Sequence, residues 1–157
     1  MEAAASDARR GRWLALAIPL GLLGGAYVSQ YGFGLYPCEM CWWQRYPHFA
    51  AIPLAAIGLA TRQTAWTWLA LLAVAVSGAI GGFHAGVEYG WWEGLTSCST
   101  TARSGGDPLE AIMNAPIIRC DVPQWTLLGI SLAGFNFLIS LGGAALAAVL
   151  LRRERAR

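Results

Sequence analysis

Four cysteines are the residues of this sequence whose type and spacing point most directly to chemistry. Cys38 and Cys41 form a C-x-x-C pair, whereas Cys98 and Cys120 lie far from each other in the second half of the chain. C-x-x-C is the spacing of redox-active dithiols, in which one thiol is activated and the other resolves a mixed disulfide. A bond across so short a ring would constrain the unfolded chain little. The pair therefore favours redox chemistry over a purely structural disulfide.

Two other uses of four cysteines remain open from the residues alone. One is a pair of structural disulfides that brace two loops. The other is zinc, although structural zinc sites usually combine two short-spaced pairs, and Cys98 and Cys120 do not form one. We expect no metal site, and we expect all four cysteines to take part in thiol–disulfide exchange.

The residues after the C-x-x-C pair indicate an activated thiolate. Cys41 is expected at the start of a helix, where unpaired N–H groups and the positive end of the helix dipole favour a negatively charged sulfur. Arg45 lies four residues later and would share the helix face of Cys41. Both effects predict a lowered pKa for Cys41, although an Arg at a helix end also commonly reaches toward lipid headgroups.

A dithiol that becomes reduced needs an electron acceptor, and the sequence contains neither G-x-G-x-x-G nor C-x-x-C-H. A membrane quinone requires no such motif, because it enters from the bilayer. Trp42, Arg45 and His48 form an amphipathic group suited to a quinone head group, unless they only belong to the aromatic belt of a membrane helix. His84 and Glu88, one helical turn apart near the outer end of the third predicted helix, are functional candidates as ionisable residues inside a membrane, unless they are simply solvated near the interface.

The composition shows what must position these residues. Of the 157 residues, 56% are hydrophobic and 13% are charged, which is about half the charged fraction of a soluble domain. Three long stretches lack charged residues, and each is long enough to cross a membrane as a helix. They lie between Arg12 and Glu39, between Arg62 and Glu88, and between Asp121 and Arg152. We therefore expect an all-α, polytopic membrane protein with no nucleic-acid partner.

A fourth span is predicted from a shorter charge-free stretch around Pro53, extended outward through Trp42 and Arg45. The chain is thus expected to form a single integral membrane domain, residues 1–157, built as a bundle of four transmembrane helices. We place the helices at about 13–31, 42–60, 66–89 and 125–151, and the outer loops at about 32–41 and 90–124. The second outer loop is expected to carry a short interfacial helix that begins near Asp107.

Four crossings place both termini on the same side of the membrane. Most arginines fall on that side, which predicts that it is cytoplasmic. They are Arg9, Arg10, Arg12, Arg62, Arg152, Arg153, Arg155 and Arg157. All four cysteines then lie on the outer, oxidising side. A cleaved N-terminal signal peptide is the competing interpretation, but the first apolar stretch is too long for one and lacks a cleavage site.

The whole arrangement resembles the DsbB family, bacterial inner-membrane proteins that generate disulfides for the periplasm. The residues that carry the resemblance are Pro37, Cys38, Cys41, Gln44 and Arg45, in a P-C-x-x-C-x-x-Q-R pattern, followed by Cys98, Cys120, Gln124 and Trp125. The resemblance extends over essentially the whole chain. It implies a quinone-coupled thiol oxidase in the bacterial inner membrane, with ubiquinone or menaquinone as the acceptor.

The resemblance also implies a role for each cysteine. Cys98 corresponds to the cysteine that forms a mixed disulfide with a periplasmic thioredoxin-like oxidase of the DsbA type, and Cys120 is its partner. Cys38 corresponds to the thiol that exchanges with this second pair. Cys41 corresponds to the thiolate that gives electrons to the quinone, and Arg45 holds the quinone oxygen or the thiolate. The resemblance also implies a quinone contact or a proton route for His84 and Glu88.

Two other functions remain as alternatives. A quinone-linked disulfide reductase of the vitamin K epoxide reductase type is also a small helical bundle with C-x-x-C, but its motif lies near the last helix, whereas here the motif precedes the second. A non-enzymatic membrane scaffold would use its cysteines only to brace the loops. The chain also has Gln44 where some DsbB relatives have an acid, so we expect no proton transfer at this position.

Overall fold

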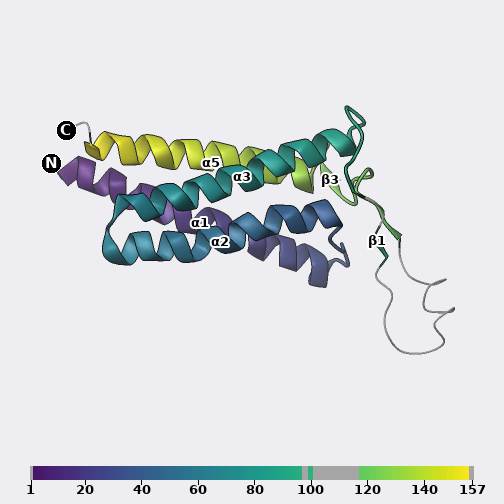
Figure 1. Cartoon of the computed structure of the whole chain (residues 1–157), viewed down its shortest axis with the longest axis horizontal. Coiled ribbons are helices and arrows are strands. Elements are labelled where there is room, and N and C mark those ends of the chain that lie inside the picture. The colour runs from purple at the N-terminus through teal and green to yellow at the C-terminus, as the bar shows by residue number, and fades with distance from the viewer. Residues whose placement is uncertain (1, 97–98, 101–116, 156–157) are drawn as a thin grey trace.

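In the computed structural model, which describes residues 2–96, 99–100 and 117–155, four long helices run alternately up and down (Figure 1). They are α1 (Glu2–Gly32), α2 (Glu39–Thr61), α3 (Thr64–Glu88) and α5 (Leu132–Arg155). Both α2 and α5 pack against α1 and α3, so the helices form a closed bundle. The prediction of an all-α architecture is confirmed for the described residues.

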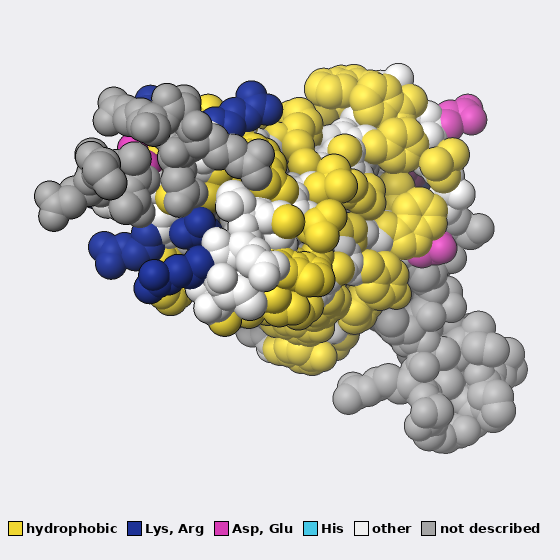
Figure 2. Space-filling view, turned by 60° about the vertical axis from the view of Figure 1, so that its left-hand side comes forward, with side chains coloured by type: hydrophobic (Ala, Val, Ile, Leu, Met, Phe, Trp, Pro, Cys, Tyr) yellow, Lys and Arg dark blue, Asp and Glu magenta, His cyan; other side chains and the backbone are white. Residues whose placement is uncertain are grey.

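Three of the helices are long and apolar enough to cross a membrane: residues Ser6–Gly32 of α1, the whole of α3, and residues Leu132–Arg153 of α5. α2 is long enough but falls short in hydropathy, because its first turns carry polar side chains. Arginine side chains gather at one end of the bundle, and a hydrophobic surface extends away from them (Figure 2). The fourth crossing, through α2, stays a prediction.

The bundle has two chemically different ends. One end holds the start of α1, the end of α5 and the turn between α2 and α3 (Figure 1), and we call it the terminal end. In that turn Arg62 adopts a left-handed conformation with φ of 58°, and Arg12 of α1 donates a hydrogen bond to its carbonyl oxygen at 3.3 Å. The opposite end, which we call the cysteine end, holds the start of α2 and the end of α3.

α2 begins at Glu39 because Cys38 acts as its N-cap. Cys38 has an extended backbone, with φ of −75° and ψ of 176°, and its sulfur accepts a hydrogen bond from the Cys41 N–H at 3.3 Å. The helix therefore starts earlier than predicted. As a result Cys41 lies in the first helical turn, although the predicted boundary between the loop and the helix fell just after it.

α5 begins at Leu132, later than the predicted start at Trp125. A small hairpin precedes it, in which β3 (Thr126–Leu127) pairs antiparallel with β4 (Ile130–Ser131). Leu128 and Gly129 form its turn with φ of 53° and 79°, a pair of positive values that tight hairpins favour and that a helix cannot contain.

The segment before this hairpin connects the loop after α3 to the bundle. Here β1 (Ser99–Thr100) pairs antiparallel with β2 (Ile117–Ile118). Beyond β2, the Gln124 side-chain amide donates a hydrogen bond to the Tyr36 carbonyl oxygen at 2.6 Å, which joins this segment to the one that precedes α2. The predicted short helix near Asp107, and Cys98, lie outside the described residues.

Candidate functional site

The C-x-x-C pair forms a reduced dithiol at the N-terminus of α2. The Cys38 thiol donates a hydrogen bond to the Cys41 sulfur at 3.0 Å, and both cysteines are free thiols. Cys38 is 1% exposed, whereas Cys41 is half-buried. The hydrogen bond to Cys41, together with burial, raises the pKa of Cys38 well above its usual range. The pair is therefore asymmetric: Cys38 holds its proton and Cys41 accepts it in a hydrogen bond.

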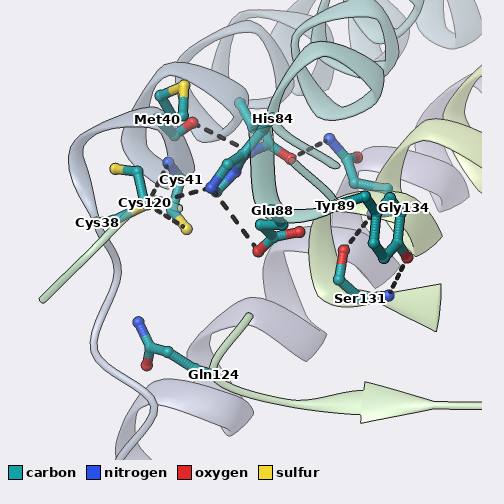
Figure 3. Close-up of polar contacts among 12 residues, drawn as sticks. Cys38, Met40, Cys41, His84, Glu88, Tyr89, Cys120, Gln124, Ser131 and Gly134 are labelled. Carbon is teal, nitrogen blue, oxygen red and sulfur yellow. Dashed lines mark hydrogen bonds and ion pairs between the residues drawn. The ribbon is translucent and has the colours of Figure 1, made fainter. Parts of the chain in front are cut away.

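A third cysteine from a distant part of the chain lies beside Cys38. The sulfurs of Cys38 and Cys120 and a ring nitrogen of His84 all lie within 4.8 Å of one another, and the three residues are buried (Figure 3). Ile118 of β2 and Cys120 pack into one apolar cluster with Cys38 and its neighbour Met40. The Thr96 hydroxyl also donates a hydrogen bond to the Cys120 sulfur at 3.2 Å. Cys38 thus has a potential disulfide partner in each direction, Cys41 and Cys120.

His84 of α3 connects the cysteines to other polar side chains. Its Nε2 atom lies 3.6 Å from the Cys38 sulfur and 3.8 Å from Glu88 Oε1, and its Nδ1 atom lies 2.8 Å from Gln44 Nε2. Figure 3 shows the imidazole between the cysteines and the Glu88 carboxylate. His84 is therefore a neighbour of the dithiol, and Glu88 is a neighbour of His84.

Gln44 is part of a buried polar network that crosses the bundle. Its Oε1 atom accepts a hydrogen bond from Asn136 Nδ2 of α5 at 2.9 Å. Asn136 Nδ2 also meets the Ser77 carbonyl oxygen of α3 at 3.1 Å, and Asn136 Oδ1 lies 3.0 Å from His48 Nε2. Asn136 and Ser77 were not predicted from the sequence. The signal that could have found Asn136 is a lone amide inside a membrane-spanning segment, which is costly unless it has partners.

A pocket of about 360 Å³ opens beside the dithiol, between α1, α2, α3 and α5. Its polar lining includes Cys41, Arg45, His48, His84 and Glu88, all of which the sequence had selected. The remaining wall is largely apolar and includes Leu22, Leu23, Phe135 and Ile139. The pocket therefore combines an apolar body with a few polar groups, as binding sites for small apolar ligands do.

Arg45 reaches away from the dithiol, toward α1. Its guanidinium donates to Gln30 Oε1 at 2.7 Å and to the Ala26 carbonyl oxygen at 3.4 Å. It also stacks over the rings of Tyr27 and Trp42, at 5.1 and 4.9 Å from their centroids. Arg45 is thus a fixed cation on the pocket wall. Trp42 is not among the lining residues, and its ring contacts the pocket residue Arg45.

These observations define a class: a helical, membrane-type bundle with a dithiol at one end and a third thiol within exchange distance is a membrane thiol–disulfide protein. Residues 8–150 match the sequence profile of the family described as Disulfide bond formation protein DsbB. The chain therefore belongs to the DsbB family, and disulfide bond formation is the activity of this family.

Two individual relatives have descriptions that agree with this assignment, and a third relative is uncharacterized. A Disulfide bond formation protein B from Verminephrobacter eiseniae (strain EF01-2) is 34% identical over 157 residues, which cover 90% of this chain and 85% of the relative. A protein with the same description from Acidovorax sp. (strain JS42) is 32% identical over 155 residues, and the match covers 85% of this chain and 86% of the relative. Uncharacterized protein RP370 from Rickettsia prowazekii (strain Madrid E) is 29% identical over 133 residues, and the match covers 80% of this chain and 77% of the relative. No solved structure matches the chain.

Proposed function

We propose that the chain is a quinone-coupled thiol oxidase that reoxidises a periplasmic thioredoxin-like partner of the DsbA type. The observation that supports it most directly is the position of Cys38. This thiol lies between Cys41, which lines the pocket, and Cys120, which belongs to the second cysteine pair. Electrons that arrive at the second pair therefore need only one exchange to reach the pocket.

Electrons enter at Cys98 and Cys120. The reduced partner gives two electrons and two protons to the Cys98–Cys120 disulfide, so the partner leaves with a disulfide and both cysteines become thiols. The Cys120 thiolate then attacks the Cys38 sulfur of a Cys38–Cys41 disulfide, and Cys41 leaves as a thiolate. Attack of Cys98 on Cys120 restores the second disulfide and releases Cys38.

The reduced Cys38 and Cys41 then return to a disulfide at the pocket. A bound quinone supplies an acceptor for two electrons and two protons, which the two thiols provide. Because the Cys38 thiol donates its hydrogen bond to Cys41, Cys41 presents the more electron-rich sulfur to the pocket. Arg45 places a positive charge on the same wall, which stabilises negative charge on sulfur or oxygen there.

The pocket suits a flat ring with polar groups and an apolar tail. Two buried polar atoms of its lining residues have no hydrogen-bond partner among the described residues: His48 Nδ1 and Glu88 Oε2. Gly21 and Gly25 line the pocket on the α1 side, and a Cβ atom added to either would meet nothing within 4 Å. We propose that the head group meets the unpartnered atoms and that the tail lies along this glycine wall.

In the same proposal α2 is the fourth transmembrane helix, and the protein lies in the bacterial inner membrane with both termini in the cytoplasm. The terminal end carries exposed arginines, among them Arg9, Arg62 and Arg153, which favours its location in the cytoplasm. The cysteine end then faces the periplasm, where disulfides persist.

The test is turnover by the purified full chain with a reduced thioredoxin-like partner and a short-tailed ubiquinone or menaquinone. We expect the partner to be oxidised and the quinone to be reduced in equal amounts. Cys41→Ser should abolish quinone reduction. The control Glu39→Gln changes an exposed side chain between the two cysteines and should preserve turnover.

Two outcomes contradict the proposal. One is undiminished quinone reduction by Cys41→Ser. The other is electron flow in the opposite direction only, from a hydroquinone to a disulfide substrate, which would make the chain a reductase.

A further inference from the structure

Two backbone carbonyl oxygens fix the orientation of the two buried amides. Gln44 Nε2 lies 3.1 Å from the Met40 carbonyl oxygen, and Asn136 Nδ2 lies 3.1 Å from the Ser77 carbonyl oxygen. A carbonyl oxygen only accepts hydrogen bonds, so each of these positions must hold the NH₂ group of the amide. The bond from Asn136 Nδ2 to Gln44 Oε1 agrees with this orientation of both amides.

The orientation of Gln44 determines which nitrogen of His84 carries the proton. Gln44 Nε2 is a donor, and it lies 2.8 Å from His84 Nδ1, so Nδ1 must accept. In a neutral imidazole one nitrogen accepts and the other donates, so the proton is on Nε2. That atom faces the Cys38 sulfur at 3.6 Å and Glu88 Oε1 at 3.8 Å.

We propose that Gln44 is a positioning residue that holds His84 in the tautomer whose Nε2–H donates to the Cys38 sulfur. The Cys41 backbone N–H donates to the same sulfur at 3.3 Å. Cys38 therefore has two N–H donors aimed at it from different elements, one from α3 and one from the first turn of α2.

The chemical consequence rests on the proposed relay. When a thiolate attacks Cys120 in a Cys38–Cys120 disulfide, the bond between the two sulfurs breaks and its electron pair goes to Cys38. The two N–H donors stabilise the negative charge that develops there. The raised pKa of Cys38 in the reduced pair comes mainly from its hydrogen bond to Cys41, and Cys38 cannot donate that bond while it is part of the Cys38–Cys120 disulfide. In this disulfide the two N–H donors favour Cys38 as the leaving group, which directs the attacking thiol to Cys120 and not to Cys38.

The same tautomer opposes a metal ion at this cluster. Cys38, His84 and Cys120 have ligand atoms close enough to share an ion. Coordination through His84 Nε2 would move the ring proton to Nδ1, where it would point at the NH₂ group of Gln44. The contact of Gln44 with His84 Nδ1 therefore suits an Nε2 atom that donates a hydrogen bond and not one that binds a metal ion.

The first test reads the tautomer by nitrogen-15 NMR of the reduced full chain. The chain has two histidines, and His48→Gln assigns their signals. We expect an unprotonated Nδ1 and a protonated Nε2 at His84. Gln44→Glu replaces the donor with a carboxylate that only accepts, so Nδ1 should become protonated. The control Gln30→Glu makes the same change at a side chain that contacts Arg45, and it should leave the His84 signals unchanged.

A protonated Nδ1 at His84 in the reduced chain that retains Gln44 would overturn the proposal. So would an unprotonated Nδ1 in Gln44→Glu.

The second test measures the choice of leaving group and stands even if Gln44→Glu fails to fold. With Cys41→Ser and Cys98→Ser, Cys38 and Cys120 are oxidised to a disulfide, which is opened with glutathione. Mass spectrometry then identifies the cysteine that carries glutathione. We expect it mainly on Cys120. His84→Leu should shift the ratio toward Cys38 by about tenfold, the effect of one hydrogen bond to a charged sulfur.

His84→Gln places an amide N–H where Nε2 was and should restore the original ratio. An unchanged ratio in His84→Leu, or no rescue by His84→Gln, would overturn the proposal. Failure of Cys38 and Cys120 to form a disulfide at all would instead contradict the proposed relay, so the two failures are distinguishable.

Discussion

The α2–α3 pair packs in opposite ways at its two ends. At the terminal end the helices touch through small residues, and a Cβ atom added to Gly58 would lie 2.6 Å from Thr67 Oγ1. The buried side chains around this contact are apolar and include Ala51, Ala55 and Ala70. At the cysteine end the same two helices are linked by side chains that hydrogen-bond, above all Gln44 and His84.

The difference shows how one helix pair provides both a frame and a site. Close packing of small residues leaves no room for a ligand and fixes the distance between the helices. At the cysteine end the polar side chains satisfy each other across α2, α3 and α5, and the adjoining space stays open as a pocket. Changes at the cysteine end should therefore alter chemistry, whereas changes at the terminal end should alter stability.

The largest effect is expected from Cys120→Ser at the cysteine end. Oxidation of the thioredoxin-like partner should fall by at least about a thousandfold, because the second cysteine pair can no longer exchange. A chemically reduced Cys38–Cys41 pair should still reduce quinone, because both thiols and the pocket remain. Stopped-flow measurement of the two half-reactions separates these results, and loss of both together would contradict the order of the relay.

A smaller effect is expected from filling the pocket. Gly25→Leu places a side chain into open space on the pocket wall, so it should raise the KM for quinone by about tenfold or more while the protein stays folded. Gly24→Leu is a matched control, because a Cβ there also meets nothing within 4 Å but Gly24 does not line the pocket. Equal KM values for the two variants would place the quinone elsewhere.

At the terminal end, Gly58→Val should lower the free energy of unfolding by about 1–3 kcal/mol, because the new side chain meets Thr67 in a tightly packed contact. Turnover per folded molecule should not change. Titration with a denaturing detergent measures the stability, with Gly24→Val as the control that adds the same side chain without a clash. A lower turnover per folded molecule would show that the two ends are not independent.

The smallest effect is expected at an exposed ion pair on the segment that carries Cys120. The hydrogen bonds from Arg119 hold the pKa of Asp121 below its usual range. A lowered pKa in the folded state means that the pair is intact at neutral pH and is lost as the pH falls through that value. Amide hydrogen exchange of residues 117–121 should therefore be slightly faster in Asp121→Asn than in the unchanged chain near pH 6, and the two should converge in strong acid. A difference in exchange rate that persists in strong acid would show that the ion pair between Arg119 and Asp121 is not its cause.

Much of the fold was predictable because a membrane helix is recognised from one continuous stretch of uncharged residues. The charge-free stretches gave the positions of α1, α3 and most of α5, and the C-x-x-C pair pointed to the end at which Cys38 and Cys120 meet. The start of α5 was misplaced, because apolar residues after Trp125 read as helix and the hairpin turn depends on the positive φ values of Leu128 and Gly129.

The contacts that complete the site are nonlocal, so the sequence did not reveal them. The pairing of Gln44 with His84 and Asn136 joins three helices. Likewise, Arg45 shares a helix with Cys41, but its hydrogen bonds go to α1. Periodicity places such residues on a helix face, and only the packing of the bundle decides which partner each one meets.

The central claim is that Cys41 gives electrons to a quinone in the adjacent pocket, and one spectrum tests it most directly. Cys38→Ser leaves Cys41 free and unable to form the C-x-x-C disulfide. Addition of a short-tailed quinone to this variant should produce a visible absorption band from charge transfer between the Cys41 thiolate and the quinone. The band should be absent when Cys41→Ser is added. No band at any pH at which the thiol is ionised, or a band that survives Cys41→Ser, would contradict the account.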